Sequence, residues 1–211
     1  MTDSCVIFAG GDTVAADTVD REAVAKAYVI CADKGLSLAG SMGIEPDLIL
    51  GDFDSLEYTP EGSNVMTYPS EKDDTDLMLA VSVALEKGFT EFIIYGACGG
   101  RLDHMMGNIA CLAMIAEGGA RGVIVGDDDI ISLHTPGSYS VPYKEGFSLS
   151  LFAYSPEVSG LTITGTKYTA YDCCLSNRVT LGVSNEITSD HAQISFSDGR
   201  LLVIQSRLDR Q

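Results

Sequence analysis

The sequence is short of positive charge. Among its 211 residues, 30 are Asp or Glu and 13 are Lys or Arg, which gives a formal net charge of −17 at pH 7 and a pI of about 4.3. Such an acidic chain repels the polyphosphate backbone of nucleic acid, so we expect no nucleic-acid partner. A small phosphorylated ligand would need a divalent cation to neutralise part of this negative charge.

Long apolar runs are also missing. No segment approaches the roughly 18 to 20 apolar residues that a membrane-spanning helix requires. The N-terminal sequence MTDSCVIFAGG has neither the basic start nor the long apolar run of a secretory signal. We therefore expect a cytoplasmic protein without a membrane span, and a composition of 45% hydrophobic and 20% charged residues is typical of a globular chain.

Paired cysteines with CxxC spacing, the sign of many zinc and redox sites, do not occur. The six cysteines stand singly in apolar runs or as the adjacent pair Cys173 and Cys174. We expect reduced thiols that behave as small buried hydrophobic side chains.

Strands and helices alternate in the first 130 residues. Six short apolar runs predict strands that are buried on both faces, as in a parallel sheet. The runs are CVIFAG (5–10), AYVICA (27–32), DLILG (47–51), VMTYP (65–69), EFIIYGA (91–97) and RGVIVG (121–126). This alternation predicts an α/β domain over residues 1–130 with right-handed crossovers, whose ligands would gather at the carboxyl ends of the strands.

Two helices are predicted within this region. The first runs from about Thr75 to Lys87 and ends at Gly88, which can take the left-handed conformation. The second runs from about Arg101 to Glu117 and ends at Gly118-Gly119. One apolar stripe is expected along the second helix; it consists of Leu102, Met105, Met106, Ile109, Leu112 and Ala113.

The pattern changes near residues 128–136. Beyond this point apolar and polar residues alternate, with β-branched and aromatic side chains and with turns at Gly, Pro, Asn and Asp, so residues 131–211 are predicted to form a β domain. The segments with this pattern are 140–158, 161–172, 179–188, 191–199 and 200–207.

Asp52 and Asp54 follow one of the predicted parallel strands. In an extended segment, residues two apart point to the same side, so the two carboxylates would converge while Phe53 turns into the core. Paired carboxylates of this kind suit Mg²⁺. The alternative is a solvated turn in which Asp54 and Ser55 cap backbone amides.

The segment EKDDTD (71–76) also follows a predicted strand. Asp74 or Thr75 can cap the following helix, with Asp76 close to the positive end of the helix dipole. Capping leaves Lys72 and Asp73 unexplained, and a lysine beside carboxylates at a helix start can hold a phosphate together with its metal.

Glycines and a basic residue follow the next predicted strand, in the segment YGACGGRLDH (95–104). Glycines at such a position let the backbone approach an anion, although the spacing matches neither a P-loop nor GxGxxG. Arg101, His104 and Asn108 share the helix face opposite the apolar stripe, and Gly107 leaves space near Asp103. His104 is favoured here as a surface or supporting histidine over a metal ligand.

Three further loops carry polar residues. Asp12 and Asp33 each follow a strand and could be simple helix caps or line a site. Ser184, Asn185 and Glu186 lie in the predicted β domain, where they would ordinarily form a hairpin turn.

Taken together, five segments in this order and spacing resemble the thiamin pyrophosphokinase family. The segments are ADKG (32–35), PDLILGDFDSL (46–56), EKDDTDLMLA (71–80), GGRLDHMMGNI (99–109) and SNE (184–186). The resemblance spans nearly the whole chain. It implies an N-terminal α/β domain, a C-terminal antiparallel β-sandwich, a homodimer, and transfer of the pyrophosphoryl group of ATP to the hydroxyethyl oxygen of thiamin, which releases AMP and thiamin diphosphate.

The resemblance also implies roles for individual residues. It implies a Mg²⁺ site, whose ligands would be Asp52, Asp54 and Asp76. It implies a binding site for the ATP phosphates, lined by Asp33, Lys34, Lys72, Asp73, Thr75, Arg101, Asp103 and His104. Ser184 and Asn185 would contact thiamin, and Asp73 or Asp103 could accept the proton of its hydroxyl group.

Two positions differ from the family pattern. Lys34 stands where some relatives have glycine, and this fits an ATP site. Some relatives stack a tryptophan on the thiamin ring, but this chain has none, so Tyr168 and Tyr171 are the candidates for that wall. The alternatives are a pyrophosphokinase for another hydroxyalkyl heterocycle, such as a pterin, and a nucleotide sensor without turnover.

Overall fold

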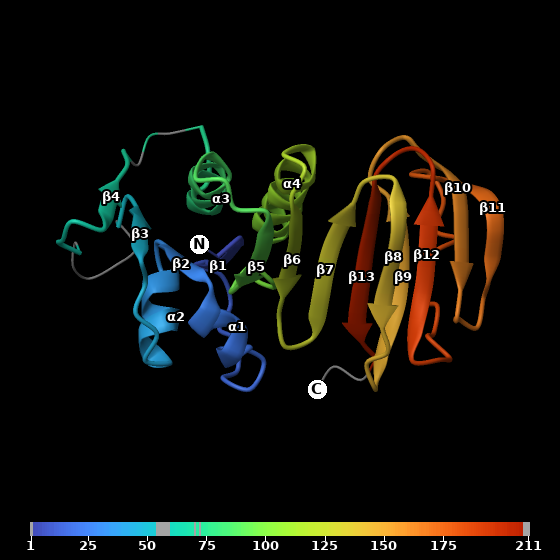
Figure 1. Ribbon diagram of the computed structural model, residues 1–211, viewed down its shortest axis with the longest axis horizontal. Helices are drawn as coiled ribbons and strands as arrows, with labels where there is room; N and C mark the ends of the chain where they lie inside the picture. Colours follow the sequence, from blue (N-terminus) through green and yellow to red (C-terminus); the bar gives the residue numbers. More distant parts are fainter. Residues whose placement is uncertain (1, 54–59, 70, 72, 209–211) are drawn as a thin grey trace. The chain divides into compact units, whose positions relative to one another are not determined.

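The chain folds into two compact units, residues 1–127 and residues 128–211. The computed structural model describes residues 2–53, 60–69, 71 and 73–208 (Figure 1). No helix in these ranges is long and apolar enough to cross a membrane.

The first unit is built on a parallel sheet of six strands in the order β4-β3-β2-β1-β5-β6. The strands are β1 (Ser4–Phe8), β2 (Tyr28–Ala32), β3 (Leu48–Gly51), β4 (Val65–Thr67), β5 (Glu91–Tyr95) and β6 (Arg121–Val125). From β1 the chain adds β2, β3 and β4 in one direction, and then returns to add β5 and β6 in the other. The strand order therefore reverses between β1 and β5, which is where ligands bind in open α/β sheets.

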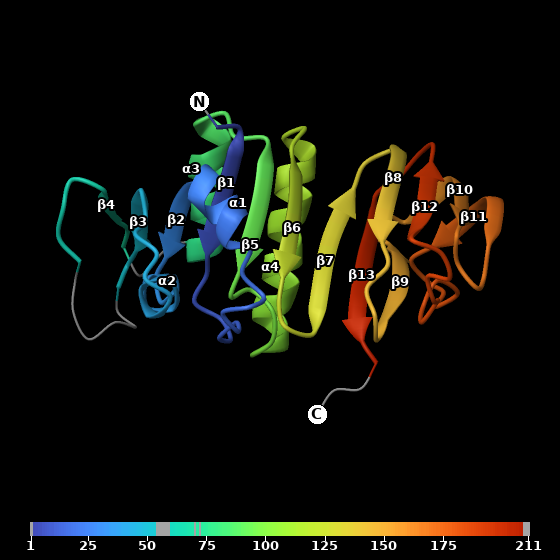
Figure 2. The ribbon, with the colours of Figure 1, turned by 60° about the horizontal axis from the view of Figure 1, so that its bottom comes forward.

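Helices cover both faces of this sheet. Figures 1 and 2 show α3 and α4 on one face and α1 and α2 on the other, which makes three layers. The helices are α1 (Arg21–Lys26), α2 (Gly35–Ser41), α3 (Asp76–Glu86) and α4 (Leu102–Glu117). Phe8, Cys31 and Tyr95 are buried in the core between the sheet and α2, as an apolar parallel strand requires.

The predicted ends of α3 agree with the structure. Thr75 is the N-cap, and its Oγ1 accepts a hydrogen bond from the Met78 amide at 3.2 Å. Gly88 follows the helix with φ +88°, the left-handed conformation that ends many helices. Local capping chemistry therefore sets both ends of this helix.

The apolar stripe predicted for α4 is only partly buried. Ile109, Leu112 and Ala113 pack into the core, but Leu102 and Met106 are exposed. Figure 2 shows that the first turns of α4 extend past the carboxyl ends of the strands, so the sheet does not cover them. The prediction for this part of the stripe was wrong.

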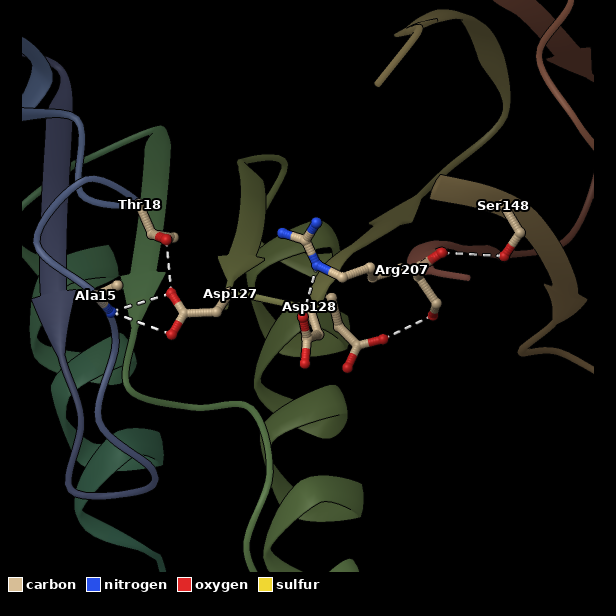
Figure 3. A network of polar contacts seen from close by, with 8 residues as sticks. Ala15, Thr18, Asp127, Asp128, Ser148 and Arg207 are labelled. Atoms are coloured by element: carbon tan, nitrogen blue, oxygen red, sulfur yellow. Dashed lines mark hydrogen bonds and ion pairs between the residues drawn. The ribbon is translucent and has the colours of Figure 1, made fainter. Parts of the chain in front are cut away.

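Asp127, directly beyond β6, fixes the loop that follows β1. Its carboxylate accepts hydrogen bonds from the Ala15 amide at 3.0 and 3.2 Å and from Thr18 Oγ1 at 2.5 Å (Figure 3). Within the second unit, the neighbouring Asp128 instead accepts a hydrogen bond from Arg207 Nε at 2.8 Å (Figure 3).

The second unit is a sandwich of two antiparallel sheets. One sheet has the order β7-β13-β9 and the other β11-β10-β12-β8. The strands are β7 (Asp129–His134), β8 (Gly137–Pro142), β9 (Phe147–Ala153), β10 (Glu157–Thr164), β11 (Ala170–Ser176), β12 (His191–Phe196) and β13 (Leu201–Arg207). Leu149, Leu161, Ile194 and Leu201 come from both sheets and share one core, as alternating apolar residues in a sandwich should.

Residues 179–188 do not form the strand that their alternating pattern predicted. They run as an irregular segment with isolated antiparallel bridges between Asn185 and Leu149 and between Ile187 and Thr166. Ser184 has φ +58°, which interrupts any regular strand, and Asn185 is paired with β9 rather than placed in a hairpin turn. Both interpretations of this segment were therefore wrong.

The six cysteines are free thiols, but they are not uniformly buried. Cys5, Cys31 and Cys111 lie in the core, where burial raises the pKa of each thiol to about 12. Cys174 is exposed, contrary to expectation, and its Sγ donates to Glu157 Oε1 at 3.0 Å. Its neighbours Cys173 and Leu175 pack against the core of the sandwich, and because successive residues of a strand point to opposite faces, Cys174 faces outward.

Candidate active site

A cavity of about 420 Å³ lies at the carboxyl ends of the strands in the first unit. The loops after β1, β2 and β5 and the starts of α3 and α4 line it, so it lies where the strand order reverses. Its polar side chains are Asp12, Asp33, Thr75, Asp76, Arg101, His104 and Asn108. Five of these were expected to take part in nucleotide binding or metal binding, and the fold brings them together.

Two helix N-termini face this cavity. Thr75 and Asp76 begin α3, and Arg101 is the N-cap of α4. Amides at a helix start that lack partners within the helix, together with the helix dipole, favour an anionic ligand. Both helices are long enough for this effect, with 11 and 16 residues.

Carboxylates outnumber cations in the cavity lining. Of the described residues in the lining, Asp12, Asp33 and Asp76 are carboxylates, and Arg101 is the one Lys or Arg. A triphosphate alone would be repelled by these side chains at close range. The three carboxylates offer oxygen ligands, which suit a hard divalent ion such as Mg²⁺.

Arg101 and Asp103 form a bidentate ion pair at the N-terminus of α4. Arg101 Nε lies 3.1 Å from Asp103 Oδ1, and the terminal Nη2 lies 2.5 Å from Oδ2. The hydrogen bonds from Arg101 lower the pKa of Asp103 below its ordinary value, and the same bonds raise the pKa of Arg101. Asp103 does not line the cavity in the structure; instead, it orients the arginine that does.

His104 and Asn108 continue the same face of α4 into the cavity. The side-chain Nδ2 of Asn108 donates a hydrogen bond to the Ala97 carbonyl at 2.8 Å, which fixes the loop after β5 against the helix. The predicted spacing of Arg101, His104 and Asn108 on one face is therefore confirmed.

Asp33 and Lys34 occupy the turn between β2 and α2. Asp33 has φ +48°, and its amide donates to the Leu50 carbonyl at 2.9 Å, so the turn is anchored to β3. Asp33 lines the cavity and is not a helix cap, since the N-cap of α2 is Lys34. The side chain of Lys34 makes no capping bond and is not part of the cavity lining.

Asp52 lies beyond the end of β3 and is half-buried, outside the cavity lining. Phe53 is buried, as expected, but its φ of +60° shows that the segment is not extended there. The argument that an extended strand aligns Asp52 with Asp54 therefore fails. Asp54 and Lys72 lie outside the described residues.

Asp73 is exposed and does not line the cavity. Among the described residues, no three His, Cys, Asp or Glu side chains gather closely enough to form a metal site by themselves. The Mg²⁺ set of Asp52, Asp54 and Asp76 thus stays a prediction, with Asp76 in the cavity wall.

Asp12, like Asp33, was left open by the sequence as either a helix cap or a residue that lines a site. It caps no helix; instead, its Oδ2 accepts a hydrogen bond from the Gly100 amide at 3.0 Å, and its side chain lines the cavity. The only signal in the sequence was its position directly after a predicted strand.

The second unit has a separate cavity of about 420 Å³ with mainly apolar walls. Its lining includes Leu151, Leu161, Tyr168, Leu181 and Asn185. Ser184 and Tyr171 do not line it, so only Tyr168 and Asn185 of the expected thiamin contacts are found in its wall.

Asn185 holds the wall of this second cavity. The residue is 7% exposed; its Oδ1 accepts from the amides of Tyr168 (3.0 Å) and Glu186 (2.9 Å), and its Nδ2 donates to the Tyr168 carbonyl (2.8 Å). These bonds offset the cost of burying an amide and fix the backbone of Tyr168. The second Nδ2 hydrogen can still donate to a ligand.

Comparisons with known proteins agree with both units. A family model described as the thiamin pyrophosphokinase catalytic domain matches residues 19–124, and one described as the thiamin pyrophosphokinase vitamin B1 binding domain matches residues 138–201. A thiamine pyrophosphokinase of Bacillus subtilis (strain 168) is 33% identical over 184 residues, covering 84% of this chain and 86% of that protein.

Solved structures give the same result. The crystal structure of thiamine pyrophosphokinase from Bacillus subtilis superposes with a TM-score of 0.85 at 31% identity, over 97% of this chain and 99% of that chain. Thiamin pyrophosphokinase from Geobacillus thermodenitrificans gives 0.81 at 30% identity, over 96% and 97% of the two chains. With both domain models matched in order along the sequence, this chain belongs to the thiamin pyrophosphokinase family.

Proposed function

We propose that this chain carries out the pyrophosphoryl transfer of its family, from ATP to thiamin, with the ATP phosphates held in the cavity of the first unit. The observation that supports this proposal is the composition of the cavity wall where the strand order reverses. Two helix N-termini, the Gly99-Gly100 turn and Arg101 all line the cavity there. Phosphoryl transfer needs little covalent help from a protein, so alignment and charge stabilisation are the tasks of such a site.

The ATP phosphates would be bound by residues from three of the strand-end loops. Arg101 and the start of α4 supply positive charge from one side, and Thr75 with the start of α3 does so from another. The proposed set is completed by Asp33 from the turn after β2 and by Lys34, Lys72, Asp73, Asp103 and His104. Arg101 lowers the pKa of Asp103 below its ordinary value, which makes this carboxylate a poorer proton acceptor than an unpaired aspartate.

We also propose that Mg²⁺ accompanies the nucleotide, held by Asp76 together with Asp52 and Asp54. The carboxylate oxygens of Asp12, Asp33 and Asp76, which outnumber the cations in the described part of the lining, support this choice of ion. When bound, the ion would neutralise phosphate charge and polarise the bond that breaks. The residues of the chain would keep the triphosphate extended and the thiamin hydroxyl oxygen in line with the β-phosphorus.

Thiamin would be bound by the second unit, through Ser184 and Asn185. Support comes from the apolar cavity that Asn185 and Tyr168 line, since pockets with apolar walls and few polar groups suit heterocyclic ligands. In this proposal residues 1–130 carry catalysis, and residues 131–211 carry thiamin binding and dimerisation.

A cytoplasmic homodimer completes the proposal. Exposed apolar side chains of the second unit, among them Leu181 and Val183, give a surface of the kind that subunit interfaces use. Sedimentation velocity at assay concentration distinguishes this dimer from a monomer.

Product analysis tests the proposed reaction directly. The chain is incubated with MgCl₂, thiamin and ATP labelled at the β-phosphate, and the products are separated. We expect AMP and labelled thiamin diphosphate in equal amounts. Formation of ADP would rule out pyrophosphoryl transfer, and a product that forms only with a hydroxymethylpterin would support the other substrate class.

A pair of variants locates the reaction in the first unit. Asp76→Asn should lower kcat by about a hundredfold or more, because a charge next to the metal and phosphates is lost at nearly constant shape. Glu86→Gln removes the same charge from the other end of α3 and should leave kcat unchanged. Equal activity of both variants would remove Asp76 from the site.

A further inference from the structure

Backbone hydrogen bonds continue between β1 and β5 beyond the ends of both strands. The Ala9 amide donates to the Tyr95 carbonyl and the Gly11 amide donates to the Gly96 carbonyl, each at 2.8 Å. A side chain on Gly11 is excluded here, because a Cβ on that residue would lie 2.5 Å from the Gly96 carbonyl oxygen. The two strand-end loops therefore run side by side into the cavity wall.

Beyond Gly11, the two loops are joined by a side chain, that of Asp12. Asp12 Oδ2 accepts a hydrogen bond from the Gly100 amide at 3.0 Å. The sequence separation of these two residues is 88, and they come from opposite sides of the point where the strand order reverses. Asp12 is thus the side chain that ties the glycine turn after β5 to the loop after β1.

The glycine turn is shaped around this carboxylate. Gly99 and Gly100 have φ of +78° and +69°, a conformation that costs other residues free energy. A Cβ on Gly99 would lie 1.9 Å from Asp12 Oδ2, so a side chain at this position would have to displace the carboxylate of Asp12. Both the backbone conformation and the close approach depend on glycine.

We propose that Asp12 is a positioning residue for the transfer reaction, which fixes the Gly99-Gly100 turn in the conformation that receives the ATP phosphates. This inference rests on the function proposed above. Asp12 acts through the hydrogen bond from the Gly100 amide, and no metal contact is needed for this role. Without that bond, the turn would have to be ordered by the nucleotide, at the expense of binding free energy.

Two other roles for Asp12 predict different behaviour. If the carboxylate occupies the place of a phosphate on the Gly100 amide, ATP has to displace it, and its removal should tighten ATP binding. If Asp12 is a ligand of Mg²⁺, the negative charge is essential and an amide cannot replace it. A positioning role needs only a hydrogen-bond acceptor, which the amide oxygen of asparagine provides.

The test compares Asp12→Asn, Asp12→Ala and a control, Asp17→Ala, which removes an exposed aspartate from the same segment. Titration calorimetry measures the dissociation constant of Mg-ATP, and steady-state assays give KM for ATP and kcat. We expect Asp12→Ala to raise the dissociation constant and KM by about tenfold, the effect of one lost hydrogen bond, with a smaller change in kcat. Asp12→Asn and Asp17→Ala should remain within about twofold of the wild type.

Every other result contradicts the positioning role. Tighter ATP binding by Asp12→Ala would show a competing carboxylate, and equal losses in Asp12→Asn and Asp12→Ala would show a charge or metal role. Wild-type affinity for Mg-ATP in all variants would show that Asp12 has no role in ATP binding. The same conclusion would follow if Asp17→Ala lost as much affinity as Asp12→Ala. Because calorimetry needs no turnover, these outcomes are separable from failure of the wild type to produce thiamin-dependent AMP.

A second comparison tests whether the carboxylate and the turn act together. Gly99→Ala should weaken ATP binding in the wild-type background, through both the clash with Asp12 and the backbone conformation. In the Asp12→Ala background the same change should cost clearly less, because the clash is gone and only the conformational cost remains. Equal costs in the two backgrounds would show that Asp12 and the turn are independent.

Discussion

Some residues in this chain take their roles from neighbours in the sequence, and others take them from contacts with distant parts of it. Thr75 could be predicted as a helix cap because its partner, the Met78 amide, is three residues away. Asp12 could not be assigned, because its partner lies 88 residues further on and depends on the pairing of β1 with β5. Arg101 was predicted to lie in the site, but its bidentate pairing with Asp103 follows from side-chain geometry that sequence spacing does not fix.

His134 on β7 makes the free energy of unfolding depend on pH. The imidazole is partly buried, its Nε2 shares a hydrogen bond with Ser132 Oγ at 2.9 Å, and its ring centroid lies 4.2 Å from that of Tyr139. Burial lowers the pKa of His134 from 6.5 to about 4. Between these values the unfolded chain binds a proton that the folded chain does not, so stability falls as the pH decreases from 6.5 to about 4.

Replacement of His134 should remove its contribution to the pH dependence of stability. The free energy of unfolding is measured by urea denaturation between pH 6.5 and about 4. For each pH unit of acidification, we expect it to fall by about 1.4 kcal/mol less in His134→Phe than in the wild type. His191→Gln, which changes an exposed histidine of β12, should follow the wild type. Parallel pH profiles for His134→Phe and the wild type would contradict a buried neutral imidazole.

Elements of the first unit were more predictable than those of the second. The helices α3 and α4 were predicted within one or two residues, because helix caps and left-handed glycines act locally. Residues 179–188 were not, because an alternating pattern records which side chains are buried and not whether a partner strand is available. In the structure this segment instead makes isolated bridges to Leu149 and Thr166.

The loop between β1 and α1 should depend on its anchor, Asp127. Asp127→Ala removes the acceptor for the Ala15 amide and for Thr18 Oγ1, so we expect stability to fall by about 1 to 2 kcal/mol. Hydrogen exchange measured by mass spectrometry should become faster in residues 13–20. Asp128→Ala, whose carboxylate bonds to Arg207 instead, should leave exchange in that loop unchanged. Unchanged exchange in Asp127→Ala would show that the loop is held by other contacts.

The charge of the whole molecule explains how its nucleotide has to be bound. With a formal charge of −17, the chain repels a triphosphate in general, and this is why the proposed site combines helix N-termini, Arg101 and a divalent ion. The general division into an α/β part and a β part could be predicted from sequence periodicity. The cavity at the reversal of strand order could be expected only in outline, since the membership of its lining depends on which loops the sheet brings together.

The most direct measurement is a crystal structure of the chain with MgCl₂ and an ATP analogue that has a methylene bridge between the α- and β-phosphates. We predict density for the triphosphate in the cavity of the first unit, with phosphate oxygens within hydrogen-bond distance of Arg101 and of the amides at the start of α3 or α4. Nucleotide density in the apolar cavity of the second unit, or outside both cavities, would contradict the account.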